Sequence, residues 1–224
     1  MLRESEERHA ILLGASGLVG GFCLQALLAE PVYSRIVLLN RRELKVGLHP
    51  QLIQRVVDFE KMTVDDFAKA DDILCALGTT IRKAGSQAAF RRVDVEYPLT
   101  AAKLARAGGA KQFLLVSSTG ADPASKNFYL RTKGDLEQEI GKLGFQALHV
   151  FRPSLLLGQR EEFRLAERVV QAIAPAVNLV MFDGLRRYRA IKAAAVGKAM
   201  VVAAREESKG VFVHEYDEIL RLAA

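Results

Sequence analysis

Short apolar runs alternate with longer segments of helical apolar spacing over the first two-thirds of the chain. We expect strands at the apolar runs 9–13, 35–39, 52–57, 72–77, 112–116 and 146–151. Helices are predicted at 18–29, 64–70, 86–92, 95–107 and 128–143. Unbroken apolar strands separated by helices are typical of a parallel sheet with both faces covered. The pattern predicts an α/β fold built on a doubly wound, mainly parallel sheet.

The pattern weakens after Pro153. Helices are predicted at 162–173, 193–206 and 216–222, and a late strand at 211–214. About 70 residues are few for an independent domain. We therefore expect one domain over 1–224, in which 154–224 form a small C-terminal appendage on the substrate side.

The composition is that of a globular protein with a sizeable core, since 50% of the 224 residues are hydrophobic and 26% are charged. No apolar run approaches the roughly 20 residues that a membrane helix needs. The first nine residues are charged and lack the apolar core of a secretory signal. We expect a cytoplasmic protein that has no membrane partner.

The charge pattern and the cysteines exclude two further classes. The net charge is +6, but the basic residues are scattered as short clusters, so no nucleic-acid partner is expected. The two cysteines and four histidines lie outside the spacings of metal ligands, so no metal site is expected.

A glycine-rich turn follows the first predicted strand and opens the first helix. Gly14, Gly17 and Gly20 give the spacing GxxGxxG. One glycine permits the sharp turn, one lets a pyrophosphate approach the backbone, and one lets the helix pack close to the sheet. Free N–H groups and the helix dipole then attract the phosphates. This combination predicts a Rossmann-type dinucleotide site, and the residues expected to form it are Gly14, Ser16, Gly17, Leu18 and Val19.

The end of the second strand indicates which dinucleotide is bound. NAD sites usually carry a carboxylate about 20 residues after the glycines. Here Asn40 is followed by Arg41 and Arg42, whose guanidinium groups can pair with a 2′-phosphate. We therefore expect NADP(H), with Arg41 the preferred contact. The alternative is that both arginines are ordinary surface residues.

Two further strand ends are candidates for cofactor contacts. Asp58 follows the third strand and could accept a hydrogen bond from the adenine, or could be an exposed carboxylate. Gly78, Thr79 and Thr80 follow the fourth strand, where the chain would pass the ribose and diphosphate. A plain turn is the alternative for this segment.

Candidate catalytic residues follow the fifth strand. Tyr129 and Lys133 are four residues apart on a predicted helix, so their side chains share one face. A nearby ammonium favours the phenolate form of a tyrosine, which suits proton transfer to or from a carbonyl substrate. Lys133 could also hold the nicotinamide ribose. Ser118, at the strand end, could hydrogen-bond the same carbonyl oxygen.

Five motifs occur in the order found in the short-chain dehydrogenase/reductase superfamily, which the chain therefore resembles: GASGLVG, LGTT, VSS, YxxxK and RPS, within residues 9–158. Residues 77–80, 92–94, 117–122 and 152–153 are more narrowly similar to the atypical subgroup around the Tat-interacting protein. The resemblance implies a Rossmann core, NADPH binding and a Ser–Tyr–Lys site.

The resemblance leaves several roles open. Many members of the superfamily carry Asn where this chain has Asp94, whose charge would alter the site. The catalytic serine is Ser117 or Ser118, and Ser118 is preferred because it lies further out of the strand. The backbone at Pro153 is implied to contact the nicotinamide amide, although Arg152–Pro153 could simply end a strand.

We consider three functions. The first is an NADP(H)-dependent oxidoreductase acting on a small carbonyl or alcohol. The second is a nucleotide-sugar epimerase or dehydratase, which the short tail disfavours. The third is a non-catalytic NADP(H)-binding regulator or redox sensor. Helices 95–107 and 128–143 could form a homodimer face or only cover the sheet. Candidate pocket walls, or alternatively core residues, are Phe163, Phe182, Tyr188 and Ile191.

Overall fold

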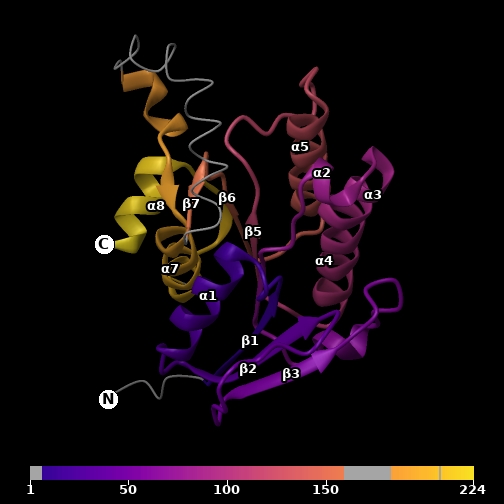
Figure 1. Cartoon of the computed structure of the whole chain (residues 1–224). Helices are drawn as coiled ribbons and strands as arrows, with labels where there is room; N and C mark the ends of the chain where they lie inside the picture. The colour runs from indigo at the N-terminus through magenta and orange to yellow at the C-terminus, as the bar shows by residue number, and fades with distance from the viewer. Residues whose placement is uncertain (1–6, 159–182, 207) are drawn as a thin grey trace.

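A computed structural model describes residues 7–158, 183–206 and 208–224 (Figure 1). Seven strands form one sheet in the order β3-β2-β1-β4-β5-β6-β9, and every neighbouring pair is parallel. The strands are β1 (Arg8–Leu13), β2 (Tyr33–Asn40), β3 (Leu52–Val56), β4 (Asp72–Cys75), β5 (Gln112–Val116), β6 (Ala147–Phe151) and β9 (Gly210–His214). The order reverses between β1 and β4, which opens a crevice at their carboxyl ends.

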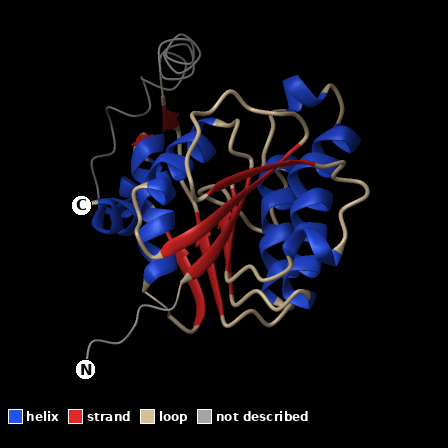
Figure 2. Cartoon of the chain, turned by 90° about the horizontal axis from the view of Figure 1, so that it is seen from below, coloured by secondary structure: helices blue, strands red, loops and turns tan. Residues whose placement is uncertain are grey.

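Helices cover both faces of this sheet (Figure 2). One layer contains α1 (Leu18–Leu28), α7 (Ala193–Arg205) and α8 (Tyr216–Ala223), and the other contains α4 (Tyr97–Ala107) and α5 (Phe128–Gly141). The predicted doubly wound, Rossmann-type α/β fold is thereby confirmed.

Shorter elements connect these layers, and they include the largest departures from the predicted pattern. They are η1 (Val64–Phe67), α2 (Ile81–Ala84), α3 (Gln87–Arg91), η2 (Arg92–Glu96), η3 (Asp183–Tyr188) and a two-stranded sheet of β7 (Leu156–Leu157) and β8 (Ile191–Lys192). The helix predicted at 95–107 starts later, because the preceding residues form the π-helical turn η2. The helix predicted at 64–70 is only the four-residue 3₁₀ turn η1. The helix predicted at 162–173 lies outside the described residues.

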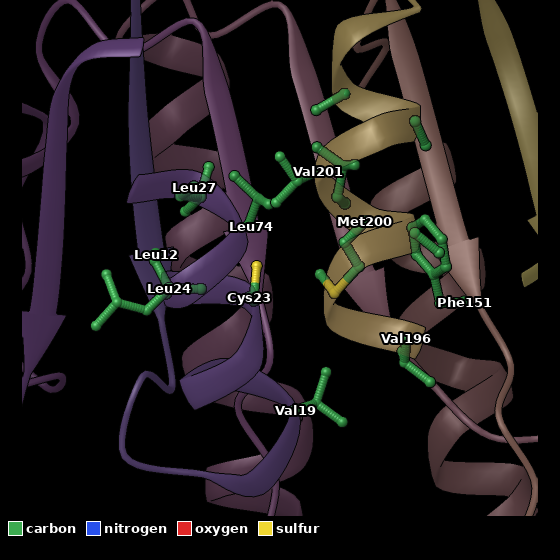
Figure 3. Close-up of a cluster of buried hydrophobic side chains, with 14 of the residues drawn as sticks. Leu12, Val19, Cys23, Leu24, Leu27, Leu74, Phe151, Val196, Met200 and Val201 are labelled. Carbon is green, nitrogen blue, oxygen red and sulfur yellow. The ribbon is translucent and has the colours of Figure 1, made fainter. Parts of the chain in front are cut away.

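The C-terminal residues complete the main core. Strand β9 pairs with β6, and α7 packs against α1. Figure 3 shows Val19 and Cys23 of α1 facing Val196 and Met200 of α7, and all four side chains are buried. The described part of the tail therefore supplies one edge strand of the sheet and two of the three helices in one layer.

A buried polar cluster joins strands at the opposite end of the sheet from the crevice. Asp72 forms an ion pair with Arg8 and accepts a 2.8 Å hydrogen bond from the Tyr33 hydroxyl. Burial raises the pKa of Asp72 to about 6, although the Arg8 guanidinium acts in the opposite direction. Arg8 and Gln112 also each donate a 2.9 Å hydrogen bond to the carbonyl oxygen of Ala204, at the end of α7. The cluster thus ties the sheet to its helix layer.

We predict that Asp72→Asn lowers the free energy of unfolding by about 3 kcal/mol, because it removes one partner of a buried ion pair. Urea denaturation measures the change. Glu139→Gln is the control, because Glu139 pairs with Lys142 at 2.6 Å on the exposed surface and its loss is expected to have no measurable effect. Equal stability of the two variants would contradict the role given to the cluster.

Candidate functional site

The glycine turn is packed so tightly against the sheet that two of its glycines admit no side chain. Gly14 has φ +88°, and a Cβ atom there would lie 2.5 Å from the carbonyl oxygen of Ala76. A Cβ atom on Gly20 would lie 2.0 Å from the carbonyl oxygen of Gly14. Gly17 is exposed at the N-cap of α1, and a Cβ atom on it would lie 3.2 Å from the carbonyl oxygen of Gly14. Packing therefore accounts for the outer two glycines, while the middle one is exposed and less tightly packed.

A cavity of about 390 Å³ lies beside this turn, at the crevice between β1 and β4. It is lined by Gly14, Ser16, Gly17, Leu39, Asn40, Arg41, Arg42, Leu44, Phe59, Ala76, Leu77, Gly78, Val93 and Tyr97. The structure thus brings the glycine turn, the two arginines and the end of β4 to one cavity. Ser118, Tyr129 and Lys133 are outside its lining.

One wall of the cavity is formed by two aromatic residues that were not predicted from the sequence. The Phe59 and Tyr97 rings pack edge to face with their centroids 5.5 Å apart, and the Tyr97 hydroxyl donates to Glu60 at 3.2 Å. Asp58 does not line the cavity, because its carboxylate turns back to accept the Glu60 N–H at 3.0 Å. The side of the cavity at which Asp58 was expected to contact the adenine is formed instead by the rings of Phe59 and Tyr97.

Several predicted cofactor residues are engaged in contacts within the protein. Thr80 accepts the Lys83 N–H at 3.1 Å through its hydroxyl and so caps α2. Val19 is buried in the core, and Leu18 packs against Gly158. Pro153 is buried, and its carbonyl accepts the Thr119 N–H at 3.0 Å.

Helix α5 brings the predicted tyrosine and lysine together. Asn127 caps the start of the helix, because its side chain accepts the Leu130 N–H at 3.2 Å. The Lys133 ammonium lies 6.0 Å from the centre of the Tyr129 ring. On its other side the Tyr129 ring packs against buried Phe90, with 5.8 Å between centroids. These contacts hold the phenol at the half-buried surface of the helix.

The Lys133 ammonium is buried and paired with a carboxylate. Its Nζ atom is 2.6 Å from Asp94 Oδ1, and the two side chains are 5% and 1% exposed. Burial alone would lower the pKa of Lys133, but Asp94 and Tyr129 raise it, and the resulting pKa lies above the ordinary value. Lys133 is therefore a fixed positive charge at neutral pH.

This pair lies directly behind the cavity. A Cβ atom on Gly78 would be 3.5 Å from Asp94 Oδ1 and 4.0 Å from Lys133 Nζ. Because Gly78 lines the cavity, the cavity and the catalytic candidates meet at this glycine.

The two candidate serines are in different situations. The Ser117 hydroxyl donates to Glu137, which also receives a 2.5 Å hydrogen bond from Arg152. Among the residues that the structure describes, the Ser118 hydroxyl has one long contact, 3.4 Å to the Thr119 carbonyl oxygen. Ser117 is thus engaged in a charged cluster, which leaves Ser118 the more available hydroxyl.

A close approach between α5 and the loop after β5 fixes the relative position of these groups. A Cβ atom on Gly134 would lie 2.3 Å from the backbone nitrogen of Pro123. Since Gly134 follows Lys133 directly, the loop that carries Ser118 and the helix that carries Tyr129 are locked against each other. Gly134 was not predicted from the sequence, since nothing near it in the chain marks a contact.

The predicted pocket walls in the tail fall in different places. Ile191 belongs to the hydrophobic core, and Tyr188 is half exposed on η3. Phe163 and Phe182 lie outside the described residues. Among those residues, no helix has the length and apolarity needed to cross a membrane, and no group of three or more His, Cys, Asp or Glu is arranged to hold a metal ion.

The fold and the glycine-turn cavity define a Rossmann protein, and relatives of known name define its family. No family model matches the chain. Protein HTATIP2 of Rattus norvegicus is 43% identical over 168 residues, covering 72% of this chain and 68% of the relative. Protein FMP52, mitochondrial, of Candida albicans is 32% identical over 223 residues, covering 95% and 96%. The chain belongs to the family of these proteins, an atypical branch of the short-chain dehydrogenases/reductases.

Solved structures of low sequence identity share the fold. MoeE5 in complex with UDP-glucose and NAD matches with a TM-score of 0.69 and 15% identity, covering 96% of this chain and 81% of that one. A Bacillus halodurans protein described as an NAD-dependent epimerase/dehydratase matches with a TM-score of 0.69 and 19% identity, covering 96% and 98%. At such identities the likeness concerns the fold alone.

The names of the fungal relatives correct one expectation. FMP52 proteins of Candida albicans, Emericella nidulans and Coccidioides immitis are named as mitochondrial, which contradicts the expected cytoplasmic location. That expectation rested on the lack of a secretory signal and of an apolar span. Neither feature bears on import into an organelle, because mitochondrial targeting uses segments of a different composition.

We predict that Gly134→Ala destabilises the protein by about 1–3 kcal/mol, because the added methyl group would overlap the backbone at Pro123. Gly141→Ala, on the same helix, has no atom within 4 Å of its new methyl group and is expected to stabilise by roughly 0.5–1 kcal/mol. Thermal unfolding compares the two variants. Stabilisation by both would contradict the close approach.

Proposed function

We propose that the chain is an NADP(H)-dependent oxidoreductase that transfers a hydride between the nicotinamide and a small carbonyl or alcohol substrate. The observation that carries this proposal is the meeting at Gly78 of the glycine-turn cavity with the Lys133 ammonium beside Tyr129. A nicotinamide that followed the cavity from the glycine turn past Gly78 would reach this pair.

The residues around the cavity fit a phosphorylated dinucleotide. The exposed N-terminus of α1 at Ser16 and Gly17 suits a diphosphate. Arg41 and Arg42 line the other end of the cavity, and Asn40 stands where NAD enzymes usually carry a carboxylate. Two guanidinium groups and no repelling carboxylate favour a 2′-phosphate, which supports NADP(H) over NAD(H).

The chain's own residues would handle the proton. The bound cofactor supplies or accepts the hydride. Tyr129 donates its hydroxyl proton to the carbonyl oxygen during reduction and removes it during oxidation. Lys133 holds a positive charge beside the phenol and stabilises its ionised form. The Ser118 hydroxyl donates a hydrogen bond to the same oxygen as negative charge develops.

We expect Arg41→Ala to weaken NADPH binding by about 10- to 100-fold, because a charge-assisted contact to the 2′-phosphate is worth about 1.5–3 kcal/mol. NADH lacks that phosphate, so its affinity should change little. Fluorescence titration measures both affinities. Arg35→Ala, an exposed arginine at the other end of β2, is the control. An unchanged ratio of the NADPH and NADH affinities in Arg41→Ala would defeat the assignment.

We expect Tyr129→Phe to retain NADPH binding and to lower kcat by about 10²- to 10⁴-fold, the usual effect of losing a general acid. The measurement is NADPH oxidation over a panel of aldehydes and ketones. Tyr216→Phe on α8 is the control and should behave as the wild type. Tight NADPH binding by the wild type without turnover of any carbonyl would contradict the oxidoreductase and favour a regulatory protein.

A further inference from the structure

Asp94 is a buried carboxylate that takes no direct part in the proposed proton transfer by Tyr129. It lies in the π-helical turn η2, and its side chain is 1% exposed. An ionised carboxylate at such a site is costly unless it is paired and hydrogen-bonded. The turn is itself informative, because single π-helical turns are frequent at functional sites.

Asp94 uses its two oxygens on two different parts of the site. Oδ1 pairs with Lys133 Nζ at 2.6 Å, and Oδ2 accepts the backbone N–H of Thr79 at 2.8 Å. Lys133 belongs to α5, whereas Thr79 belongs to the segment after β4 that borders the cavity. One side chain therefore joins three elements that are distant in sequence.

Among the described residues, the charged and titratable groups that act most strongly on Lys133 are Asp94 from η2, Tyr129 from its own helix and Cys75 from the end of β4. Cys75 is fully buried, and burial raises the pKa of its thiol to about 11, so it is neutral at ordinary pH. Asp94 is therefore the opposing charge that decides the field around the ammonium.

We propose that Asp94 is a positioning residue that locks the Lys133 ammonium and the Gly78–Thr79 segment together and offsets the positive charge felt by Tyr129. This inference rests on the proposed function and assigns Asp94 a role within it. An asparagine at position 94 could hold the Gly78–Thr79 segment but could not neutralise the Lys133 ammonium. With the carboxylate present, Lys133 is held in place and part of its positive charge is offset.

The restraint on Lys133 can be tested without turnover. We expect Lys133 in Asp94→Asn to react with acetic anhydride about three- to tenfold faster at pH 8, because loss of the carboxylate favours the free amine. Mass spectrometry of the cofactor-free protein measures the rate at this residue. Asp135→Asn is the matched control, because it removes one carboxylate two residues from Lys133 that instead pairs with Arg91 at 3.2 Å. Equal rates at Lys133 in the wild type and Asp94→Asn overturn the proposal.

A double-mutant comparison keeps the test decisive if Asp94→Asn folds poorly. Removing both charges in Asp94→Asn with Lys133→Met should give a higher melting temperature than Asp94→Asn alone, since no buried ammonium then lacks its carboxylate. A double variant that melts at or below the temperature of the single variant overturns the pairing.

The pH dependence of alcohol oxidation measures how far Asp94 offsets the charge of the Lys133 ammonium. In Asp94→Asn the unopposed ammonium favours the phenolate, so the profile should move to lower pH by roughly one unit. Asp135→Asn should leave it in place, and an equal shift in both variants overturns the charge role. If the wild type oxidises or reduces nothing, the proposed function fails, while the labelling and melting results still decide whether Asp94 restrains Lys133.

Discussion

The whole site depends on how closely the backbone turns at the carboxyl end of β1. Gly14 packs against the carbonyl of Ala76, just after the neighbouring strand β4, and Gly20 packs against Gly14 in turn. Both of these close contacts are possible only because glycine has no side chain. They bring the start of α1 beside the crevice between β1 and β4, so the cavity, its arginines and its aromatic wall all follow from this contact.

Charged groups that are paired inside the protein give the other half of the site its geometry. Asp94 ties α5 to the segment after β4, and Glu137 ties the same helix to Ser117 and Arg152 at the ends of β5 and β6. Buried ion pairs add little net stability, because desolvation offsets their attraction. They do restrict which arrangements are acceptable, and here they orient one helix relative to three strand ends.

Much of the fold was predictable because its signals are local. Unbroken apolar runs marked six strands, and the glycine spacing marked the turn between β1 and α1. The site was predictable in part. Arg41, Arg42, Gly14 and Gly17 line the cavity, and Lys133 lies beside Tyr129. Asp58 does not line the cavity, and Phe59 and Tyr97 take that place. An aromatic residue in a polar neighbourhood carries no local sign of the wall it forms.

The sequence by itself determined the alternation of strands and helices, the glycine turn after the first strand and the helical face shared by Tyr129 and Lys133. Each depends on residues within a few positions of one another, so spacing alone reveals it. Tertiary structure decided that Asp94 meets Lys133, that Ser117 is engaged by Glu137 and that Gly134 contacts the loop after β5. These contacts join residues brought together only when the helices pack on the sheet, and no local pattern encodes which partner each side chain meets.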